Sequence, residues 1–331
     1  MKSLLLLLSL TSLSLAVKSR SSPPPGCLSV GPTPGAYSTI QSAVDSLSLT
    51  SPAPQCIFIH PGLYVEQVLL PARAAQLSIY GSTPDVSSYT GNTVTISGSK
   101  SQKLNISNDE TATLRVKSAN FKLYNVNVEN TFGKGSQAVA VSAYADSGYY
   151  GCAFRGFQDT LLAQVGKQVY ARTKIEGATD FIFGQHAPAW FEGCDVRVVT
   201  PQNGIGYVTA SGRSSATDPN YYVFNNCDVS AADGSAVADG VYFLGRPWSM
   251  FAKVVFQRSS LSKVINSAGW HIWNVGDERT SNVTFAEFGN TGAGAVGPRA
   301  NFSTALAKPV RIGSVLGCEY AKAGYFDVEY M

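Results

Sequence analysis

The amino-acid sequence predicts an all-β, single-domain solenoid, a parallel β-helix, and three observations support that prediction. A degenerate repeat recurs along the chain, the segments between turns are short and rich in β-branched and aromatic residues, and no helical patterns of about 10–15 residues alternate with them. A parallel sheet built from βαβ units would show that alternation. An antiparallel sandwich whose strands resemble one another by chance is the alternative.

The first 17 residues have the pattern of an export signal. Lys2 gives a positive start, Leu4–Leu15 is apolar, and Ser14–Ala16 is a small-residue cleavage context. We therefore expect residues 1–17 to be a signal peptide and residues 18–331 to be a secreted, extracellular domain. No other segment approaches the roughly 18 consecutive apolar residues of a membrane span. Glycosylation sequons fit this interpretation, and they occur at Asn105, Asn282 and Asn301.

The segment Ser38–Leu47 has helical spacing, with Ser38 in the N-cap position. One face of this helix is apolar and consists of Ile40, Ala43, Val44 and Leu47. Because a solenoid needs covered ends, we expect the helix to cap the N-terminal end of the coils.

The repeat places an aromatic or large apolar residue three positions before a small residue, with an aliphatic residue or Phe two positions later again. Six copies occur, at Leu123/Val126/Val128, Tyr149/Cys152/Phe154, Tyr170/Thr173/Ile175, Phe191/Cys194/Val196, Phe224/Cys227/Val229 and Phe256/Ser259/Leu261. They are spaced by 26, 21, 21, 33 and 32 residues, as in coils that carry one variable loop each.

Strand-like segments accompany the repeat at Ala138–Ser142, Trp190–Val199 and Tyr221–Ser230. Beyond Trp273 the copies fade into a stretch rich in Gly, Asn and Thr. We expect loops and a tail packed back along the coils there.

Composition and inventory exclude several functions. Charged residues make up 14% of the chain and the net charge is +3, without the basic runs of nucleic-acid-binding proteins. The three histidines lack HExxH spacing and the six cysteines lack CxxC spacing, which argues against a zinc site. No G-x-S-x-G or G-x-x-x-x-G-K pattern occurs either, so carboxylates are the remaining candidates for chemistry, and no cofactor is indicated.

Two aspartates, Asp159 and Asp180, form the candidate catalytic pair. They are 21 residues apart, which is one coil of the repeat, so they should lie on successive coils about 5 Å apart along the axis. Two carboxylates this close cannot both ionise easily, and one is expected to keep its proton and act as an acid. A pair of turn aspartates with no chemical role is the alternative interpretation.

Other polar residues fall on the same face. Gln137 precedes Gln158 by 21 residues, and Arg246 follows Asp180 by 66. An arginine can hold a carboxylate bidentately and keep it ionised, which favours Asp180 as the anion and leaves Asp159 protonated. A nucleophile, a proton donor and amide donors together are what acyl transfer to water requires.

Several ordered motifs resemble the pectin methylesterases, and the likeness is strongest to the secreted fungal members. They are Gly62–Glu66, Gly135–Val141, Gly156–Leu162, Asp180–Gly184, Leu244–Trp248, Gly269–Trp273 and the tail Phe288–Ala295. This resemblance implies a right-handed parallel β-helix over residues 18–331. It also implies hydrolysis of the C6 methyl esters of galacturonate units in pectin, which releases methanol and leaves pectate.

The resemblance also assigns roles. Asp180 would be the nucleophile, and Asp159 would protonate the departing methoxide and then activate water. Gln137 and Gln158 would stabilise the oxyanion, and Arg246 would orient Asp180 and lower its pKa.

For the substrate, the resemblance implies a groove lined by Trp248 and Trp273, with Tyr144 as a further candidate. The partner would be methyl-esterified pectin, with no nucleic acid, membrane or cofactor. We expect a monomer, and a plant inhibitor protein is a further candidate partner.

The cysteines allow a separate prediction from stacking. Cys194 and Cys227 occupy the same position in consecutive copies, so their Cα atoms should be about 5 Å apart and a disulfide is expected. Cys152 lies two coils before Cys194 and should be a buried free thiol. A second bond, Cys27–Cys56, is expected near the N-terminal cap.

Three other functions stay open at this point. A pectin or pectate lyase would need a calcium-binding carboxylate cluster or an Arg or Lys base, and no acidic cluster adjoins the aspartate pair. A glycosidase would use two acids about 5–9.5 Å apart, which this pair could mimic. A non-catalytic pectin-binding solenoid would keep the tryptophans but has no need for both acids and Arg246.

Overall fold

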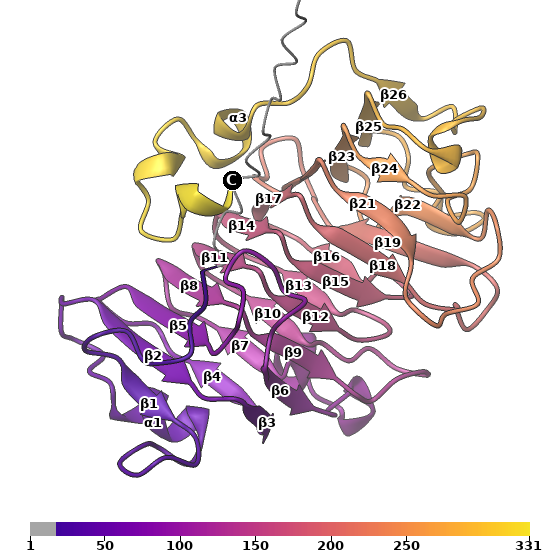
Figure 1. The fold of residues 1–331 in the computed structure, drawn as a ribbon. Coiled ribbons are helices and arrows are strands. Elements are labelled where there is room, and N and C mark those ends of the chain that lie inside the picture. Colours follow the sequence, from indigo (N-terminus) through magenta and orange to yellow (C-terminus); the bar gives the residue numbers. More distant parts are fainter. Residues whose placement is uncertain (1–17) are drawn as a thin grey trace, which may run out of the picture.

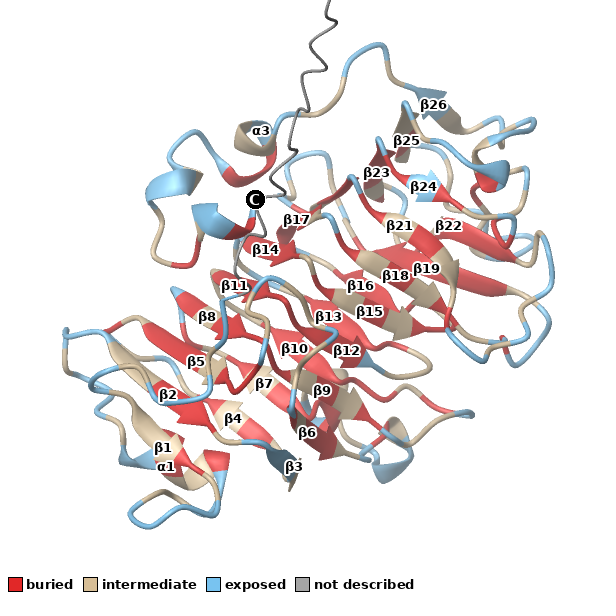
Figure 2. Cartoon of the chain, in the orientation of Figure 1, coloured by how far each residue is buried: buried red, intermediate tan, exposed pale blue. Residues whose placement is uncertain are grey.

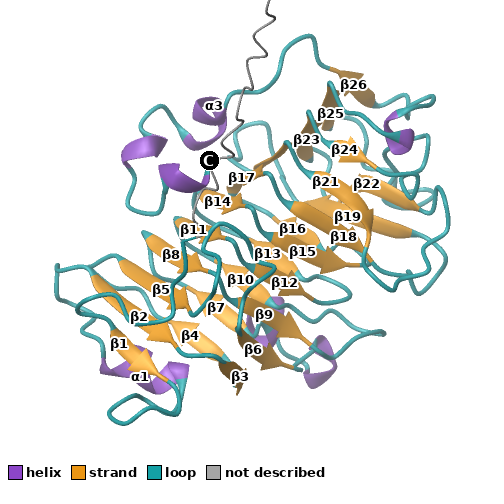
Figure 3. Cartoon of the chain, in the orientation of Figure 1, coloured by secondary structure: helices purple, strands orange, loops and turns teal. Residues whose placement is uncertain are grey.

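The computed structural model describes residues 18–331, and the predicted signal peptide lies outside them. The described chain is a right-handed parallel β-helix, as predicted: successive strands pass from one sheet to the next around each coil, and the coils stack along one axis (Figure 1). Within residues 18–331 the strands form three sheets, of eleven, seven and eight strands. Figure 3 shows how little helix accompanies them.

The strand bounds follow the three sheets. The eleven-stranded sheet contains β1 (Leu28–Val30), β2 (Gln55–Ile59), β5 (Leu77–Gly81), β8 (Phe121–Tyr124), β11 (Ser147–Tyr150), β14 (Gln168–Ala171), β17 (Pro188–Glu192), β20 (Tyr221–Asn225), β23 (Lys253–Gln257), β25 (Thr284–Phe288) and β26 (Ser303–Ala305). The seven-stranded sheet contains β4 (Val68–Leu70), β7 (Leu114–Val116), β10 (Val141–Ala143), β13 (Leu161–Ala163), β16 (Ile182–Gly184), β19 (Gly206–Ser211) and β22 (Tyr242–Pro247). The eight-stranded sheet contains β3 (Gly62–Val65), β6 (Val94–Gly98), β9 (Asn127–Asn130), β12 (Ala153–Arg155), β15 (Lys174–Gly177), β18 (Asp195–Val198), β21 (Asp228–Ala231) and β24 (Ser260–Leu261).

The helices are short. They are α1 (Ile40–Ser46), α2 (Asn108–Thr111) and α3 (Ile312–Leu316), with 3₁₀ turns η1 (Gln102–Leu104), η2 (Ala293–Ala295), η3 (Tyr320–Lys322) and η4 (Val328–Tyr330). None of the helices in residues 18–331 is long and apolar enough to cross a membrane.

The six repeat copies stack in register. Their first residues lie one above another in the eleven-stranded sheet, and the aromatic rings of Tyr170, Phe191 and Phe224 follow each other with centroids 4.7 and 4.2 Å apart. Their last residues stack in the same way in the eight-stranded sheet. These side chains fill the inside of the coil, where Figure 2 shows the buried positions.

A sharp turn separates the first and last residue of each copy. The residue before the small one has left-handed backbone, with φ between 48° and 58° at Asn125, Gly151, Arg172, Gly193, Asn226 and Arg258. Glycine and asparagine adopt this conformation most readily. The predicted segments Trp190–Val199 and Tyr221–Ser230 are therefore not single strands, because each bends here into two strands.

The ends of the chain differ in detail from expectation. The N-terminal helix begins at Ile40, because Thr39 rather than Ser38 accepts a hydrogen bond from the Ser42 amide. It packs on β1, β2 and β4, while its role as a cap stays a prediction.

Beyond Trp273 the coils continue, since β25 and β26 extend the eleven-stranded sheet. The segment that carries α3 lies against the outer face of that sheet (Figure 1).

One of the two predicted disulfides is present. Cys27 and Cys56 are bonded and Cys152 is a buried free thiol, as predicted. Cys194 and Cys227 are buried free thiols as well, so the predicted Cys194–Cys227 bond is wrong. Stacked side chains run parallel, and each thiol donates to a carbonyl of the preceding coil, Cys194 Sγ to Tyr170 O at 3.2 Å. Close Cα atoms are not enough, because a disulfide also needs Cβ atoms that approach each other.

Removing the Cys27–Cys56 bond should destabilise the N-terminal coils. The bond closes a segment of 29 residues, and opening such a loop costs about 2–4 kcal/mol. We expect Cys27→Ala/Cys56→Ala to lower the free energy of unfolding, measured with denaturant, by that amount. Cys318→Ala, which removes an exposed free thiol, is the matched control and should change it by less than about 0.5 kcal/mol. Equal stability of the two variants would contradict this prediction.

Candidate active site

A pocket of about 380 Å³ lies where the turns from the eight-stranded sheet enter the seven-stranded sheet. Its lining includes seven of the eight residues predicted for catalysis and substrate binding, namely Gln137, Gln158, Asp159, Asp180, Arg246, Trp248 and Trp273. Tyr144 is not part of the lining. It lies on the neighbouring apolar surface, and the Lys117 ammonium sits 3.2 Å from the centre of its ring.

In-register stacking brings the two acids together. Gln158 pairs with Thr179 in an isolated parallel bridge, and the Asp159 amide donates to the Thr179 carbonyl at 3.1 Å. One coil earlier, the Ala138 amide donates to the Gln158 carbonyl at 3.1 Å. The coil spacing read from the repeat therefore stacks Gln137 on Gln158 and, in the adjacent column, Asp159 on Asp180.

Both aspartates have left-handed backbone, with φ of 65° at Asp159 and 49° at Asp180. Asp and Asn are the non-glycine residues that tolerate this conformation best, and such strained positions concentrate at functional sites. Each aspartate ends a turn just before a strand of the seven-stranded sheet, β13 or β16. Each carboxyl group is thus placed two residues before a buried strand.

Arg246 binds Asp180 bidentately. Its Nε and Nη2 atoms donate to the two carboxylate oxygens at 2.9 and 2.7 Å. The guanidinium carbon also lies 4.1 Å from the centre of the Tyr207 ring and 4.3 Å from that of the Trp273 ring. Two cation–π contacts and two charge-assisted hydrogen bonds therefore hold the guanidinium group in place.

The two carboxyl groups are equally buried, with 6% of each residue exposed, but differ in their partners. Burial raises the pKa of Asp159 well above its ordinary value, and the Asp180 charge raises it further. Burial also raises the pKa of Asp180, against the two hydrogen bonds from Arg246, which lower it. Arg246 thus lowers the pKa of Asp180 as expected, but burial raises that pKa by more. Asp180 remains the carboxyl that ionises first, because Asp159 lacks an arginine partner.

Asn108 is a site residue that the sequence reasoning missed. Its Nδ2 donates to Asp159 Oδ2 at 3.3 Å, and its Oδ1 is buried without a partner in the described chain. Ser107 and Glu110 form a capping box that begins α2 at Asn108. The pattern Ser-x-x-Glu is readable in the sequence. The contact of Asn108 with Asp159, 51 residues along the chain, cannot be read from the sequence.

Arg279 was also missed. Its guanidinium lies 4.8 Å from the centre of the Trp273 ring, on which Arg246 also packs, and it donates to the Trp248 carbonyl. Asp277 holds it in place with an ion pair of 2.7 Å. Arg279 therefore connects both predicted substrate-binding tryptophans.

The donor set does not resemble a metal centre. In residues 18–331 no group of three or more His, Cys, Asp or Glu residues is close enough to hold a metal ion. An apolar cluster adjoins the pocket instead, and two of its members, Phe183 and Ala210, line it. The cluster consists of Ala112, Val139, Leu162, Phe183 and Ala210, with Trp248 and Tyr144 packed against it.

Comparison with known proteins identifies close relatives. The family model described as pectinesterase matches residues 31–305. A pectinesterase from Aspergillus niger is 50% identical over 315 residues, which are 95% of this chain and 94% of that protein. The crystal structure of the deglycosylated pectin methylesterase from Aspergillus niger superposes with a TM-score of 0.87 at 40% identity, covering 95% of this chain and all of that one. The pectin methylesterase from carrot superposes with a TM-score of 0.84 at 27% identity, covering 93% and 98%.

Asn108 should tune the acidity of Asp159. Its amide stabilises the ionised carboxylate, so Asn108→Ala should raise the higher of the two apparent pKa values of the aspartate pair. A carboxyl ¹³C NMR titration measures this directly. Gln202→Ala, which removes an exposed amide elsewhere, is the control and should leave the titration unchanged. A lower or unchanged upper pKa in Asn108→Ala would contradict the assignment.

Proposed function

This chain belongs to the pectinesterase family, and on that premise we propose that Asp180 and Asp159 hydrolyse the C6 methyl esters of pectin in this pocket. The observation that carries the proposal is the asymmetry of the two acids. One is bound bidentately by Arg246, and the other is buried one coil away without a cation of its own. A nucleophile and an acid need different protonation at the same pH, which this asymmetry provides.

The first half of the reaction forms an acyl-enzyme. The Asp180 carboxylate attacks the ester carbonyl carbon, and the C–O bond to the methoxy group breaks as Asp159 gives its proton to the departing oxygen. Methanol leaves, and the galacturonate carbonyl is joined to Asp180 as an anhydride. Asp159 is now the ionised partner, and the Asn108 amide stabilises it.

The second half returns both acids to their first state. Asp159 takes a proton from water, the resulting hydroxide attacks the galacturonate carbonyl, and Asp180 leaves as a carboxylate. The product is an acid that ionises in water. One ester and one water thus become one carboxylic acid and one methanol, and no group outside the chain is needed.

The side chains around the acids have supporting roles. Gln137 and Gln158 line the pocket beside the aspartate column and are the amide donors for the oxyanion of each tetrahedral intermediate. Trp248 and Trp273 offer faces on which sugar rings stack. A neutral methyl ester suits a pocket that already holds a carboxylate, whereas the anionic product is repelled by it and released.

We place this activity outside the cell, in a single catalytic domain of residues 18–331. The export-signal pattern of residues 1–17 supports this location, as does the Cys27–Cys56 bond, which forms in oxidising compartments. The sequon residues Asn105, Asn282 and Asn301 are all exposed, as glycosylation requires. The monomeric state and binding of a plant inhibitor protein stay predictions.

The test of function uses highly methylated pectin. We expect methanol release at unchanged chain length and with no unsaturated product. Unsaturated ends would indicate a lyase, shorter chains a glycosidase, and binding without any product a non-catalytic solenoid.

Substitution of each acid separates their roles. Asp180→Asn removes the nucleophile and should abolish methanol release, because the amide cannot attack the ester. Asp159→Asn keeps the nucleophile but removes the proton donor, so kcat should fall by about 10²–10⁴. Both variants should still bind methylated oligogalacturonate in a calorimetric titration. Near-normal turnover by Asp180→Asn with complete loss in Asp159→Asn would reverse the two assignments.

Arg246 should determine the acid limb of the pH–activity profile. Its hydrogen bonds lower the pKa of Asp180, so without them Asp180 ionises only at higher pH, and the limb moves up. We expect a large displacement for Arg246→Gln and a smaller one for Arg246→Lys, which keeps the charge but loses the bidentate geometry. The profile of kcat/KM against pH measures both. An acid limb that does not move in Arg246→Gln would contradict the role given to this residue.

A further inference from the structure

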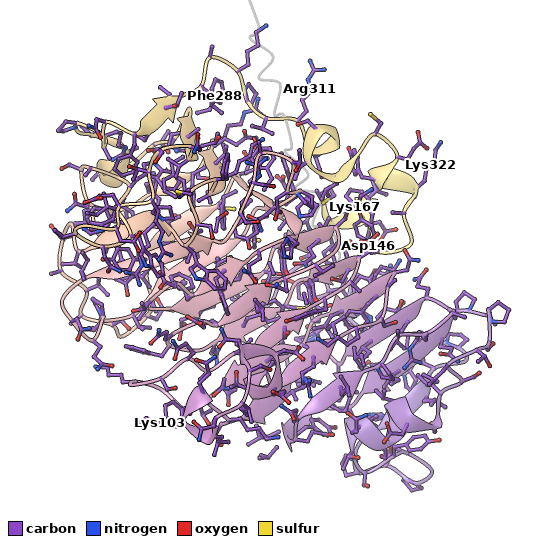
Figure 4. The ribbon with its side chains drawn as sticks, turned by 180° about the vertical axis from the view of Figure 1, so that it is seen from behind. Lys103, Asp146, Lys167, Phe288, Arg311 and Lys322 are labelled. Atoms are coloured by element: carbon purple, nitrogen blue, oxygen red, sulfur yellow. A yellow bond between two sulfur atoms is a disulfide. The ribbon has the colours of Figure 1, made fainter. Side chains whose placement is uncertain are left out.

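The segment between β6 and β7 brings Asn108 into the active site. This segment contains η1 and α2 and lies outside the strands of the coil, and Figure 4 shows Lys103 of η1 at the edge of the molecule. The Asn108 Nδ2 atom donates to Asp159 Oδ2 at 3.3 Å, which is slightly longer than the usual range for such a bond. A displacement of α2 by a few tenths of an ångström would therefore break this contact.

The next residue, Asp109, is held by three side chains. Its Oδ2 atom pairs with the Arg115 guanidinium at 2.6 Å, and its Oδ1 atom accepts from Lys117 Nζ at 2.8 Å and from Ser142 Oγ at 2.7 Å. Burial raises the pKa of the Asp109 carboxyl, but these hydrogen bonds lower it by more, so that the pKa lies below its ordinary value. Asp109 is therefore a carboxylate at neutral pH, and both of its oxygens have partners.

The three partners belong to the sheet that also positions the catalytic acid. Arg115 is in β7, Lys117 directly follows that strand, and Ser142 is in β10, where it pairs with Arg115. On its other side β10 pairs with β13, which begins two residues after Asp159. The Asp109 carboxylate thus ties the start of α2 to the same sheet that Asp159 leads into.

The other contacts between α2 and the coils of residues 18–331 lie mainly at the C-terminal end of the helix. The side-chain amides of Gln67 and Asn130 and the backbone amide of Val139 all donate to residues 110–112. At the start of the helix, Asn108 Oδ1 is buried and has no partner in the described chain, so this atom does not fix the side chain. The position of the Asn108 amide therefore depends on the residue that follows it.

We propose that Asp109 is a positioning residue of the active site, whose ion pairs hold α2 so that the Asn108 amide reaches Asp159. This inference rests on the proposed function, in which Asp159 is ionised between the two halves of the reaction and Asn108 stabilises that ion. Asp109 acts through Asn108 alone. Without the ion pairs the start of α2 is free to shift, and the ionised Asp159 loses its amide donor.

The test is a carboxyl ¹³C NMR titration of the full secreted protein. Asp109→Asn should raise the upper apparent pKa of the aspartate pair by about 0.4–1, which corresponds to one ordinary hydrogen bond. Loss of a negative charge by itself would lower that pKa, so the sign separates positioning from direct electrostatics. Asn108→Ala/Asp109→Asn should show no further rise beyond that of Asn108→Ala, because both substitutions remove the same contact.

A milder variant and a matched control accompany this titration. Ser142→Ala removes one neutral donor to Asp109 and leaves its charge in place, so it should give a smaller rise of the same pKa. The control is Asp195→Asn, which removes a carboxylate that Arg197 and Tyr89 hold on the eight-stranded sheet, and it should leave the titration unchanged.

The pH dependence of activity gives a second readout. Asp159 must be protonated in the free enzyme, so the alkaline limb of kcat/KM against pH should move to higher pH in Asp109→Asn. An unmoved limb with a lower rate at every pH would indicate a structural role and overturn the proposal. A lower or unchanged upper pKa in Asp109→Asn, or an equal rise in Asp195→Asn, would also overturn it. If the wild type releases no methanol from methylated pectin, the proposed function fails, while the NMR titration still tests the positioning role.

Discussion

The chemistry of this protein depends on one constraint, the stacking of successive coils in register. Leu161 pairs with Ile182 and Tyr149 with Tyr170, each pair 21 residues apart, so residues at equal positions in consecutive coils become neighbours. The aromatic column inside the coil holds this register through face-to-face contacts. A slip of one residue would turn inward side chains outward and would separate Asp159 from Asp180. Stability and catalysis therefore share the same packing.

Burial and charge act against each other at the two acids. Excluding water raises the pKa of both carboxyl groups, and only Asp180 has an arginine to oppose this. Arg246 is in turn fixed by Tyr207 and Trp273, and Trp273 packs against Arg279. Trp273, which we propose binds substrate, and Arg246, which we propose keeps Asp180 ionised, thus belong to one stack. A substitution at Trp273 would affect both properties.

Much of this arrangement is readable from the sequence, and its limits have physical reasons. The repeat identifies the coils because inward positions must be apolar and the turn position small. The same spacing aligns Gln137 with Gln158 and Asp159 with Asp180. The spacing says nothing about the direction of a side chain, which is why Cys194 and Cys227 are stacked but not bonded. Asn108, at the start of α2, and Arg279, in a loop, reach the site from outside the repeat, and no periodic pattern marks them. The direction in which the pKa of Asp180 shifts could not be predicted from the sequence either, because the burial that raises it depends on every neighbouring coil.

In the proposed reaction Asp180 forms a covalent acyl-enzyme, and the partitioning of that intermediate between two acceptors tests whether it forms. Methyl and ethyl esters of the same oligogalacturonate would give an identical acyl-enzyme, which water or added propanol can then capture. We expect one ratio of free acid to propyl ester from both substrates, because the first alcohol has left before water or propanol attacks. A ratio that depends on the leaving alcohol would contradict it and would make Asp180 a base that activates water.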